Sequence, residues 1–216
     1  MFLTELLVEL KNWLAGLKDQ YAAEWERLPD IGLYMDQVQT YIDRQLGLYR
    51  LNEEDKLLTP AMINNYIKDG LIPRAEAKKY GPVHLALLIM IATLKQVLSI
   101  QDLNQLLSDY REPEPVASLY RQFLHDQRCS LQDTEARVIE ELDRLTEKLN
   151  QKESEALDSD VMQALRELSL ALCIEARTKI LVAQKIMSIL SNEQTILTEQ
   201  DQKNNKKKEK NHEARS

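Results

Sequence analysis

Apolar side chains recur every three or four residues over most of the chain, which is the spacing of an amphipathic helix. The first of these stripes predicts one helix over residues 4–26, and the second predicts a helix over residues 34–49. Residues 116–149 and 161–190 carry two longer stripes and predict two long helices towards the C-terminal end. The pattern of alternating apolar and polar residues that marks a half-buried strand does not organise any of these stretches.

The last stripe has apolar residues on more than one side. One side runs along residues 161–190, and Leu170, Ile174 and Leu181 add a second. A helix that is apolar on two sides needs more than one neighbour. The preceding helix, the N-terminal helix and a second copy of the protein could each supply one.

Shorter elements are marked between these helices by cap and turn residues. Thr59 can accept a hydrogen bond at a helix start, and Pro60 suits the first helical position, so a helix begins here. Gly70 is where a left-handed cap would end that helix, and Pro73 prevents it from resuming. The predicted helix therefore covers the eight or so residues in between, with Asn64 and its polar neighbours on one side.

Two more helices follow within the next thirty residues. Pro82 begins a helix whose residues 85–94 are almost wholly apolar, and a run of this length is too short to cross a bilayer. We therefore expect a buried helix. Ser99 and Asp102 have the spacing of a capping box and predict a further short helix.

Composition agrees with an all-α fold. The chain has 216 residues, 44% of them hydrophobic, with only five glycines and two phenylalanines. Cys129 and Cys173 are isolated from each other and from ligand-spaced histidines, so we expect no metal site and a reducing cytoplasm. Glu5 and Glu9 interrupt the apolar N-terminus, so we expect no signal peptide, and we expect no membrane span because no stretch is long enough.

Residues 59–107 resemble the winged helix-turn-helix head of the MerR-type transcription regulators. The residues that carry the resemblance are Tyr66, Gly70, Leu71, Pro73, Arg74, Lys78, Lys79 and Tyr80, followed by Val97, Leu98, Ser99 and Ile100. Asn64 and Asn65 stand where the family usually has an Arg and a Tyr, and Gly81 replaces a Ser or Thr. With its flanks, the chain also looks like an uncharacterised bacterial family that carries this head and has no assigned effector.

The resemblance implies a recognition helix in a major groove of double-stranded DNA, a wing against the adjacent backbone, and a homodimer formed through the C-terminal helices. Asn64 and Asn65 would read bases, because an Asn amide can pair with the edge of adenine. Tyr80 would donate its hydroxyl to a phosphate. The candidate phosphate-binding cations are Lys68, Arg74, Lys78 and Lys79. The alternative for each is a structural role, as packing residue or solvated turn.

Net charge is −7, which opposes binding to a polyanion, but the charge is unevenly distributed. Over residues 59–80 four cations stand against two anions, and from Lys203 onwards six stand against two.

The expected division of the chain is an N-terminal helix, a winged head, a helical dimerisation region and a disordered basic tail. Their bounds are residues 1–33, 34–110, 111–192 and 193–216.

Enzyme chemistry has no support in the sequence. His84, His125 and His212 are the only histidines, and none lies in a motif with a nucleophile or a metal partner. We expect no catalysis and no cofactor. The function expected is regulation of transcription by a cytoplasmic DNA-binding protein whose effector the sequence does not reveal. An adaptor that uses the same fold to bind protein is the alternative.

Overall fold

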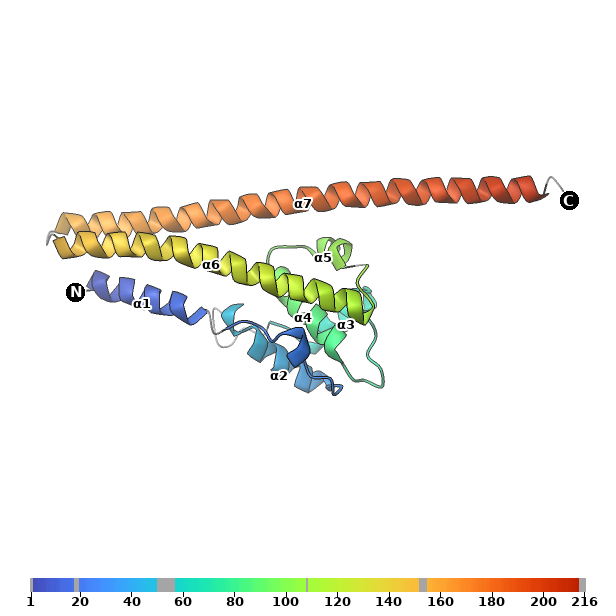
Figure 1. The fold of residues 1–216 in the computed structure, drawn as a ribbon, viewed down its shortest axis with the longest axis horizontal. Helices are drawn as coiled ribbons and strands as arrows, with labels where there is room; N and C mark the ends of the chain where they lie inside the picture. The colour runs from blue at the N-terminus through green and yellow to red at the C-terminus, as the bar shows by residue number, and fades with distance from the viewer. Residues whose placement is uncertain (1, 18–19, 50–56, 108, 152–154, 214–216) are drawn as a thin grey trace. The chain divides into compact units, whose positions relative to one another are not determined.

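The structure is a computed structural model that describes residues 2–17, 20–49, 57–107, 109–151 and 155–213 (Figure 1). Over these ranges the chain is all-α: it forms seven α-helices and no strand, as predicted. The chain divides into two compact units, Met1–Ser169 and Leu170–Ser216. The helices are α1 (Phe2–Gly16), α2 (Met35–Gln45), α3 (Pro60–Lys68), α4 (Pro82–Leu94), α5 (Ile100–Leu107), α6 (Pro113–Gln151) and α7 (Glu155–Glu213).

The head forms around α4, which is the helix that the sequence predicted to be buried. Every residue from Leu85 to Ala92 is at most 1% exposed, because α4 is apolar all round and has neighbours on all sides. Helices α2 and α6 both pack against it. The same core contains Ala22 and Leu124, so side chains on both sides of residues 34–110 complete the head.

The N-terminal helix is shorter than predicted. Helix α1 ends at Gly16, and a separate 3-10 helix, η2, covers Trp25–Arg27. Glycine is a poor helix former, and Ala22 and Leu28 are buried in the head core instead of continuing the α1 stripe. The prediction of one helix over residues 4–26 is therefore wrong beyond Gly16.

Helix α1 lies along the second half of α6 (Figure 1). Leu7 and Leu14 are buried in this packing. Lys11 Nζ lies 2.7 Å from Asp143 Oδ1 and 3.1 Å from Thr146 Oγ1 on α6. The amphipathic stripe of α1 thus covers an apolar surface of α6.

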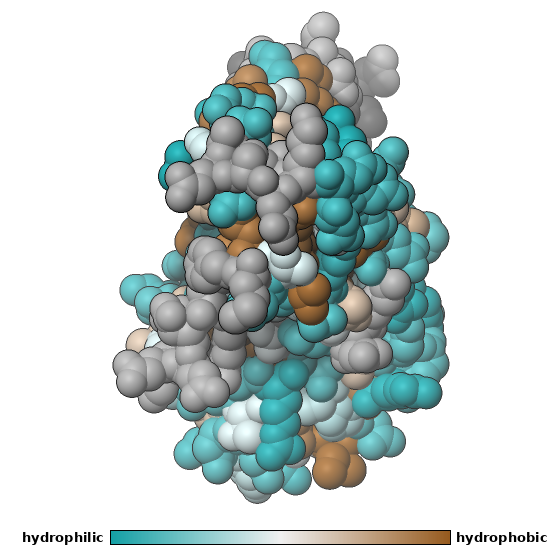
Figure 2. All heavy atoms as spheres, turned by 90° about the vertical axis from the view of Figure 1, so that its left-hand side faces the viewer, coloured by the Kyte–Doolittle hydropathy of each residue, from teal (hydrophilic) through white to brown (hydrophobic). Residues whose placement is uncertain are grey.

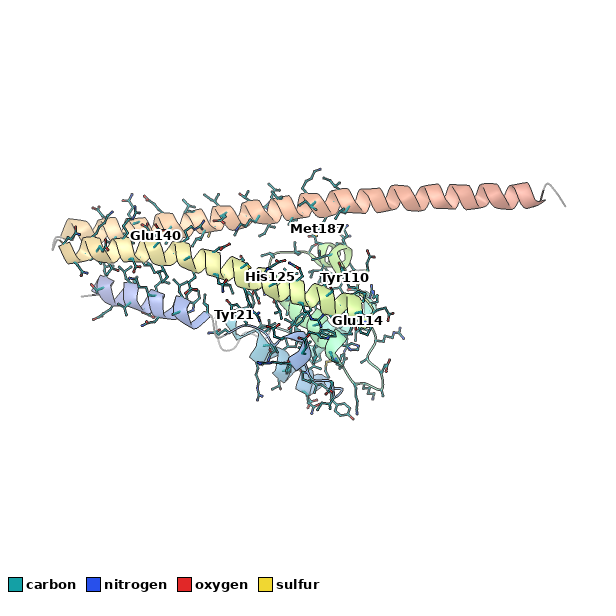
Figure 3. The ribbon with its side chains drawn as sticks, viewed as in Figure 1. Tyr21, Tyr110, Glu114, His125, Glu140 and Met187 are labelled. Atoms are coloured by element: carbon teal, nitrogen blue, oxygen red, sulfur yellow. The ribbon has the colours of Figure 1, made fainter. Side chains whose placement is uncertain are left out.

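Helix α6 is continuous from Pro113 to Gln151. Pro113 and Pro115, which would break a helix if they lay in its interior, both lie in the first turn of α6. Backbone N–H groups in a first turn have no intrahelical partner, so proline is tolerated there. The connection between α5 and α6 is correspondingly short; Figure 3 labels Tyr110 in the connection and Glu114 in the first turn of α6.

Helix α2 also differs from expectation. Helix α2 ends at Gln45 and is followed by the 3-10 helix η3, Gly47–Tyr49, where one helix over residues 34–49 was predicted. Leu46 leaves the helical conformation with φ −110° and ψ 23°. Residues 50–56, which follow η3, lie outside the described residues, and Leu57 and Leu58 after them are buried.

In the C-terminal unit, α7 continues to Glu213, where a disordered tail was predicted from residue 193. Gln, Glu and Lys are good helix formers, and a helix already nucleated extends at the cost of ordering one residue for each new hydrogen bond. The second apolar side predicted for this stretch is on the surface, with Leu170, Ile174 and Leu181 exposed to 61%, 59% and 56%.

Hydrophilic residues predominate on the face of the molecule drawn in Figure 2, and hydrophobic residues appear there only in small groups. This distribution is ordinary for a protein surface. None of the helices in the described part of the chain combines the length and the hydrophobicity that a membrane crossing requires.

Candidate nucleic-acid interface

Helix α3 begins where its cap residues predicted. The N–H of Met62 donates to Thr59 Oγ1 over 3.3 Å, and Thr59 has the extended backbone of an N-cap, with φ −113° and ψ 158°. Pro60 occupies the first helical position. The start of the helix is therefore fixed by local sequence and agrees with the prediction.

The end of α3 is a left-handed cap at Gly70, whose φ is +73°. The N–H of Gly70 donates to the carbonyl of Ile67 over 3.1 Å, and the N–H of Leu71 donates to the carbonyl of Tyr66 over 2.8 Å. This pair of bonds is a Schellman motif, which satisfies carbonyls that a helix end would leave open. Buried Leu71 then anchors the chain in the head core.

Side chains from outside α3 reach the same end of the helix. Asn104 Nδ2 on α5 donates to the carbonyl of Asp69 over 3.4 Å, and the Arg111 guanidinium, in the connection to α6, donates to the carbonyl of Gly70. A cation near a helix C-terminus also interacts favourably with the helix dipole. The position of α3 is thus tied to α5 and to the start of α6.

Helix α3 presents one polar edge and buries the other. Ile63 and Tyr66 are 0% and 4% exposed, whereas Asn64, Asn65 and Lys68 are all exposed. The three candidate DNA-binding residues of this helix therefore share a surface, and the burial of Tyr66 fits its spacing with Ile63.

The basic segment after α3 forms a small hairpin, which we call the wing (residues 74–80). Glu76 and Lys79 form an antiparallel bridge, in which the N–H of Lys79 donates to the carbonyl of Glu76 over 2.8 Å. The two residues between them, Ala77 and Lys78, have φ values of 48° and 64°. Positive φ at both central residues is the geometry of a type I′ turn. The candidate cations Arg74, Lys78 and Lys79 are exposed.

The wing is attached to the head through a paired backbone contact. Leu33 and Tyr80 exchange two hydrogen bonds, each 2.9 Å long. Gly32 makes the approach possible, since a Cβ there would lie 2.6 Å from Lys79 Cβ. The ammonium of Lys79 also lies 5.7 Å from the ring centroid of Tyr34, within cation–π range. Nothing in the sequence around Gly32 indicated this close approach.

Tyr80 does not face outward as predicted. It is 5% exposed, and its ring meets the ring of His84 edge-on at a centroid distance of 5.4 Å. Burial raises the pKa of the Tyr80 hydroxyl. Side chains alternate across an extended segment, so exposure of Lys79 turns Tyr80 inward. The predicted phosphate contact by Tyr80 is therefore wrong, and Tyr80 packs at the base of the wing.

His84 connects the base of the wing to the start of α4. Its Nδ1 accepts a hydrogen bond from the N–H of Gly81 over 3.1 Å, and its Nε2 lies 3.4 Å from the carbonyl oxygen of Arg74. Burial lowers the pKa of His84, while the contacts with Arg74, Glu76 and Gly81 oppose this effect. A neutral imidazole, protonated at Nε2, satisfies both contacts, so His84 has a structural role at the base of the wing.

The described part of this region thus carries two amides and four cations on its surface, on a helix edge and a wing joined by five residues. Amides and cations are the groups that contact base edges and phosphates in protein–DNA complexes. Within the described residues, no group of three His, Cys, Asp or Glu side chains is placed to hold a metal ion.

By its fold the protein is an all-α protein with a helical head that carries a small wing. Residues 23–123 match the model of a domain of unknown function (DUF1836). The matched segment begins next to Ala22 of the head core and ends one residue before Leu124, so it covers the head and the first part of α6. No curated protein and no solved structure matches the chain.

Proposed function

We propose that this protein is a sequence-specific DNA-binding protein of the cytoplasm, and that it regulates transcription with a head similar to that of MerR-type regulators. The observation that carries the proposal is the joint exposure of the polar α3 edge (Asn64, Asn65 and Lys68) and the cationic wing. Both belong to the unit Met1–Ser169. In a winged head, the helix reads the major groove and the wing contacts the neighbouring backbone.

The two kinds of exposed group would do different work. Asn64 and Asn65 would pair with base edges, for which an Asn amide offers both a donor and an acceptor. Lys68, Arg74 and the wing lysines would neutralise phosphates, which adds affinity and fixes the register without reading sequence. Substitution of the two asparagines should therefore change sequence specificity, whereas substitution of the cations should change the overall affinity for DNA.

The wing turn supports a functional role because its sequence is not the one that its geometry favours. A type I′ turn favours Asn-Gly, and the L residues Ala77 and Lys78 each cost about 1–2 kcal/mol in the left-handed region. Strain of this kind is concentrated at functional sites. Here it keeps a lysine at the tip of the turn, where a phosphate contact would be made.

A homodimer through the C-terminal helices is part of the proposal. The exposed side chains of Leu170, Ile174 and Leu181 support it, because three apolar residues in line on a helix are a characteristic site of helix–helix association. Two-fold symmetry would then present two heads to two half-sites of an operator.

Binding to fluorescently labelled fragments of genomic DNA, measured by anisotropy at two salt concentrations, tests the proposal. The expected result is a set of fragments bound with nanomolar dissociation constants and a steep loss of affinity with salt. The Lys78→Ala/Lys79→Ala variant should bind all fragments more weakly and lower the salt slope by about 2, one for each lysine removed. Asn64→Ala and Asn65→Ala should change which fragments are preferred.

A matched control removes two exposed lysines from other helices. Lys148→Ala/Lys185→Ala alters the net charge as the wing variant does, but leaves the head intact. The proposal predicts no change of salt slope for this control. Equal loss in both variants would indicate general electrostatics, and absence of DNA binding by the unaltered chain would refute the proposal.

A protein-binding adaptor is the second candidate function. The net charge of −7 and the apolar residues exposed on α7 favour it, because a partner helix could cover those residues. The contact surface would lie on α6 or α7, and the wing lysines would have no role in it. DNA binding that is absent, or that is indifferent to Lys78 and Lys79, would favour this candidate over the regulator.

A further inference from the structure

A pocket of about 350 Å³ lies where the head meets α6. This volume is in the range of small-molecule sites. The described residues that line it come from η3, from the end of α4 and from the middle of α6. Helices α4 and α6 pack against each other. They are Tyr49, Thr93, Leu94, Phe123, Asp126, Gln127, Ser130 and Leu131. Figure 3 labels His125, the neighbour of Asp126, on this part of α6.

One polar atom of the lining is buried without a partner. Gln127 Nε2 donates to the hydroxyl of Tyr49 over 2.5 Å, but Gln127 Oε1 has no hydrogen-bond partner and almost no contact with solvent. A buried acceptor left unpaired is unfavourable, and in native structures it usually has a functional or ligand-related explanation. A hydrogen-bond donor that reaches Gln127 Oε1 from the pocket would supply the missing partner.

The rest of the lining indicates the chemistry of such a donor. Thr93 donates its hydroxyl to the carbonyl of Ile89, which leaves its oxygen as an acceptor, and Asp126 adds a carboxylate at the exposed rim. The carboxylate is oriented by Gln122, whose Nε2 donates to Asp126 Oδ1 over 2.8 Å. Phe123 supplies an aromatic wall. None of the described lining residues is Lys or Arg, so the pocket suits a donor or cation and disfavours an anion.

We propose that this pocket binds a small organic amine with an aromatic or aliphatic body. The apolar body would lie against Leu94, Phe123 and Leu131, and the ammonium would pair with Asp126 at the rim. An N–H of the ligand, or a water that it orders, would reach Gln127 Oε1. Binding of the amine to this pocket does not depend on whether the head binds DNA.

A regulatory consequence follows if the proposed DNA-binding function holds. Helix α4 is the centre of the head, and the start of α6 is next to Arg111, which caps the end of α3. A ligand between the end of α4 and α6 would favour one packing of these two helices over others. It would thereby change the position of α3 and the affinity of the head for DNA.

The binding test uses the full chain without DNA and a panel of probes: phenethylamine, phenylpropylamine and phenylbutylamine. Heteronuclear NMR follows the side-chain amide of Gln127 and the backbone amides of α4 and α6 during titration. We expect saturable shifts at these groups for at least one amine. Phenylbutyrate and phenylbutanol, which match phenylbutylamine in body but lack its charge, should bind at least about tenfold more weakly.

Two variants make the result specific to the pocket. Asp126→Asn keeps the shape of the rim and should weaken amine binding about tenfold while sparing phenylbutanol. Ser130→Trp should block the pocket and abolish the shifts, and unchanged circular dichroism would show that it folds. No saturable binding by any amine, equal binding of phenylbutylamine and phenylbutyrate, or shifts that persist in Ser130→Trp would each overturn the proposal.

The regulatory step is then measured on a DNA fragment that the protein binds. The best amine, at saturation, should change the dissociation constant for DNA at least about fivefold in the unaltered chain and not in Ser130→Trp. Unchanged DNA affinity would overturn the coupling, and DNA binding without amine binding would overturn the pocket proposal alone. Amine binding without DNA binding would refute the regulator and leave the pocket established.

Discussion

Gly32→Ala is the substitution whose effect on the wing follows most directly from the structure. The new Cβ would lie 2.6 Å from Lys79 Cβ, 3.3 Å from its Cγ and 3.1 Å from its Cδ. Side-chain rotation can move the last two atoms but not Lys79 Cβ, which is fixed to the backbone. The wing must therefore move away from the segment that contains Leu33.

The size of the effect comes from the hydrogen bonds that this movement breaks. Leu33 and Tyr80 exchange two backbone hydrogen bonds and are only 9% and 5% exposed, so water does not replace the bonds fully. At about 0.5–1.5 kcal/mol for each bond, the free energy of unfolding should fall by roughly 1–3 kcal/mol. Equilibrium urea denaturation followed by circular dichroism measures it. Under the proposed function, DNA affinity should fall as well, because Lys79 moves with the wing.

Gly16→Ala is the matched control. Apart from its chain neighbours and the backbone of its own helix, no atom of the described residues lies within 4 Å of a Cβ at Gly16. This residue is helical, so alanine should stabilise the protein by about 0.5–1 kcal/mol. If Gly32→Ala changes stability by less than about 0.5 kcal/mol, or behaves like Gly16→Ala, the close approach of wing and head is not a feature of the protein in solution.

Three further predictions concern pH, turn strain and self-association. Because burial lowers the pKa of His84 below its ordinary 6.5, the unfolded chain binds this proton more readily. The free energy of unfolding should therefore fall as pH drops below about 6.5, and less steeply in His84→Gln when urea denaturation is repeated from pH 8 to pH 5. Ala77→Asn should stabilise the protein by roughly 1 kcal/mol in the same assay, since Asn tolerates a positive φ; destabilisation would contradict the turn assignment. Ile174→Glu should convert the proposed dimer to a monomer in sedimentation velocity. Ala176→Glu, about 200° around α7 from it, should not.

The sequence correctly predicted those features of the head that depend on residues close together in the chain. Thr59, Pro60 and Gly70 fixed the bounds of α3, because a cap acceptor, a missing N–H and a positive φ act within one turn of the residue that carries them. The capping box at Ser99 and Asp102 is likewise present, with the N–H of Asp102 donating to Ser99 Oγ over 3.1 Å. Such signals need no knowledge of the tertiary structure.

Other features depended on contacts between distant residues. The burial of Tyr80 is set by its pairing with Leu33, which lies 47 residues earlier in the chain. The role of Gly32 is set by the same pairing. Apolar spacing continued beyond Gly16 in the sequence, yet Ala22 left the helix for the head core. The pocket could not be foreseen, because its walls belong to three separate elements.

The continuity of α6 across its 39 residues has a mechanical consequence. At 1.5 Å per residue it is a rod about 58 Å long, and a rotation of about 5° at its first turn displaces its last turn by about 5 Å. Because the first turn packs in the head and the second half lies against α1, a small tilt at one end would be transmitted as a large displacement at the other. A change of packing at the head would therefore be detectable as a displacement of the far end of α6.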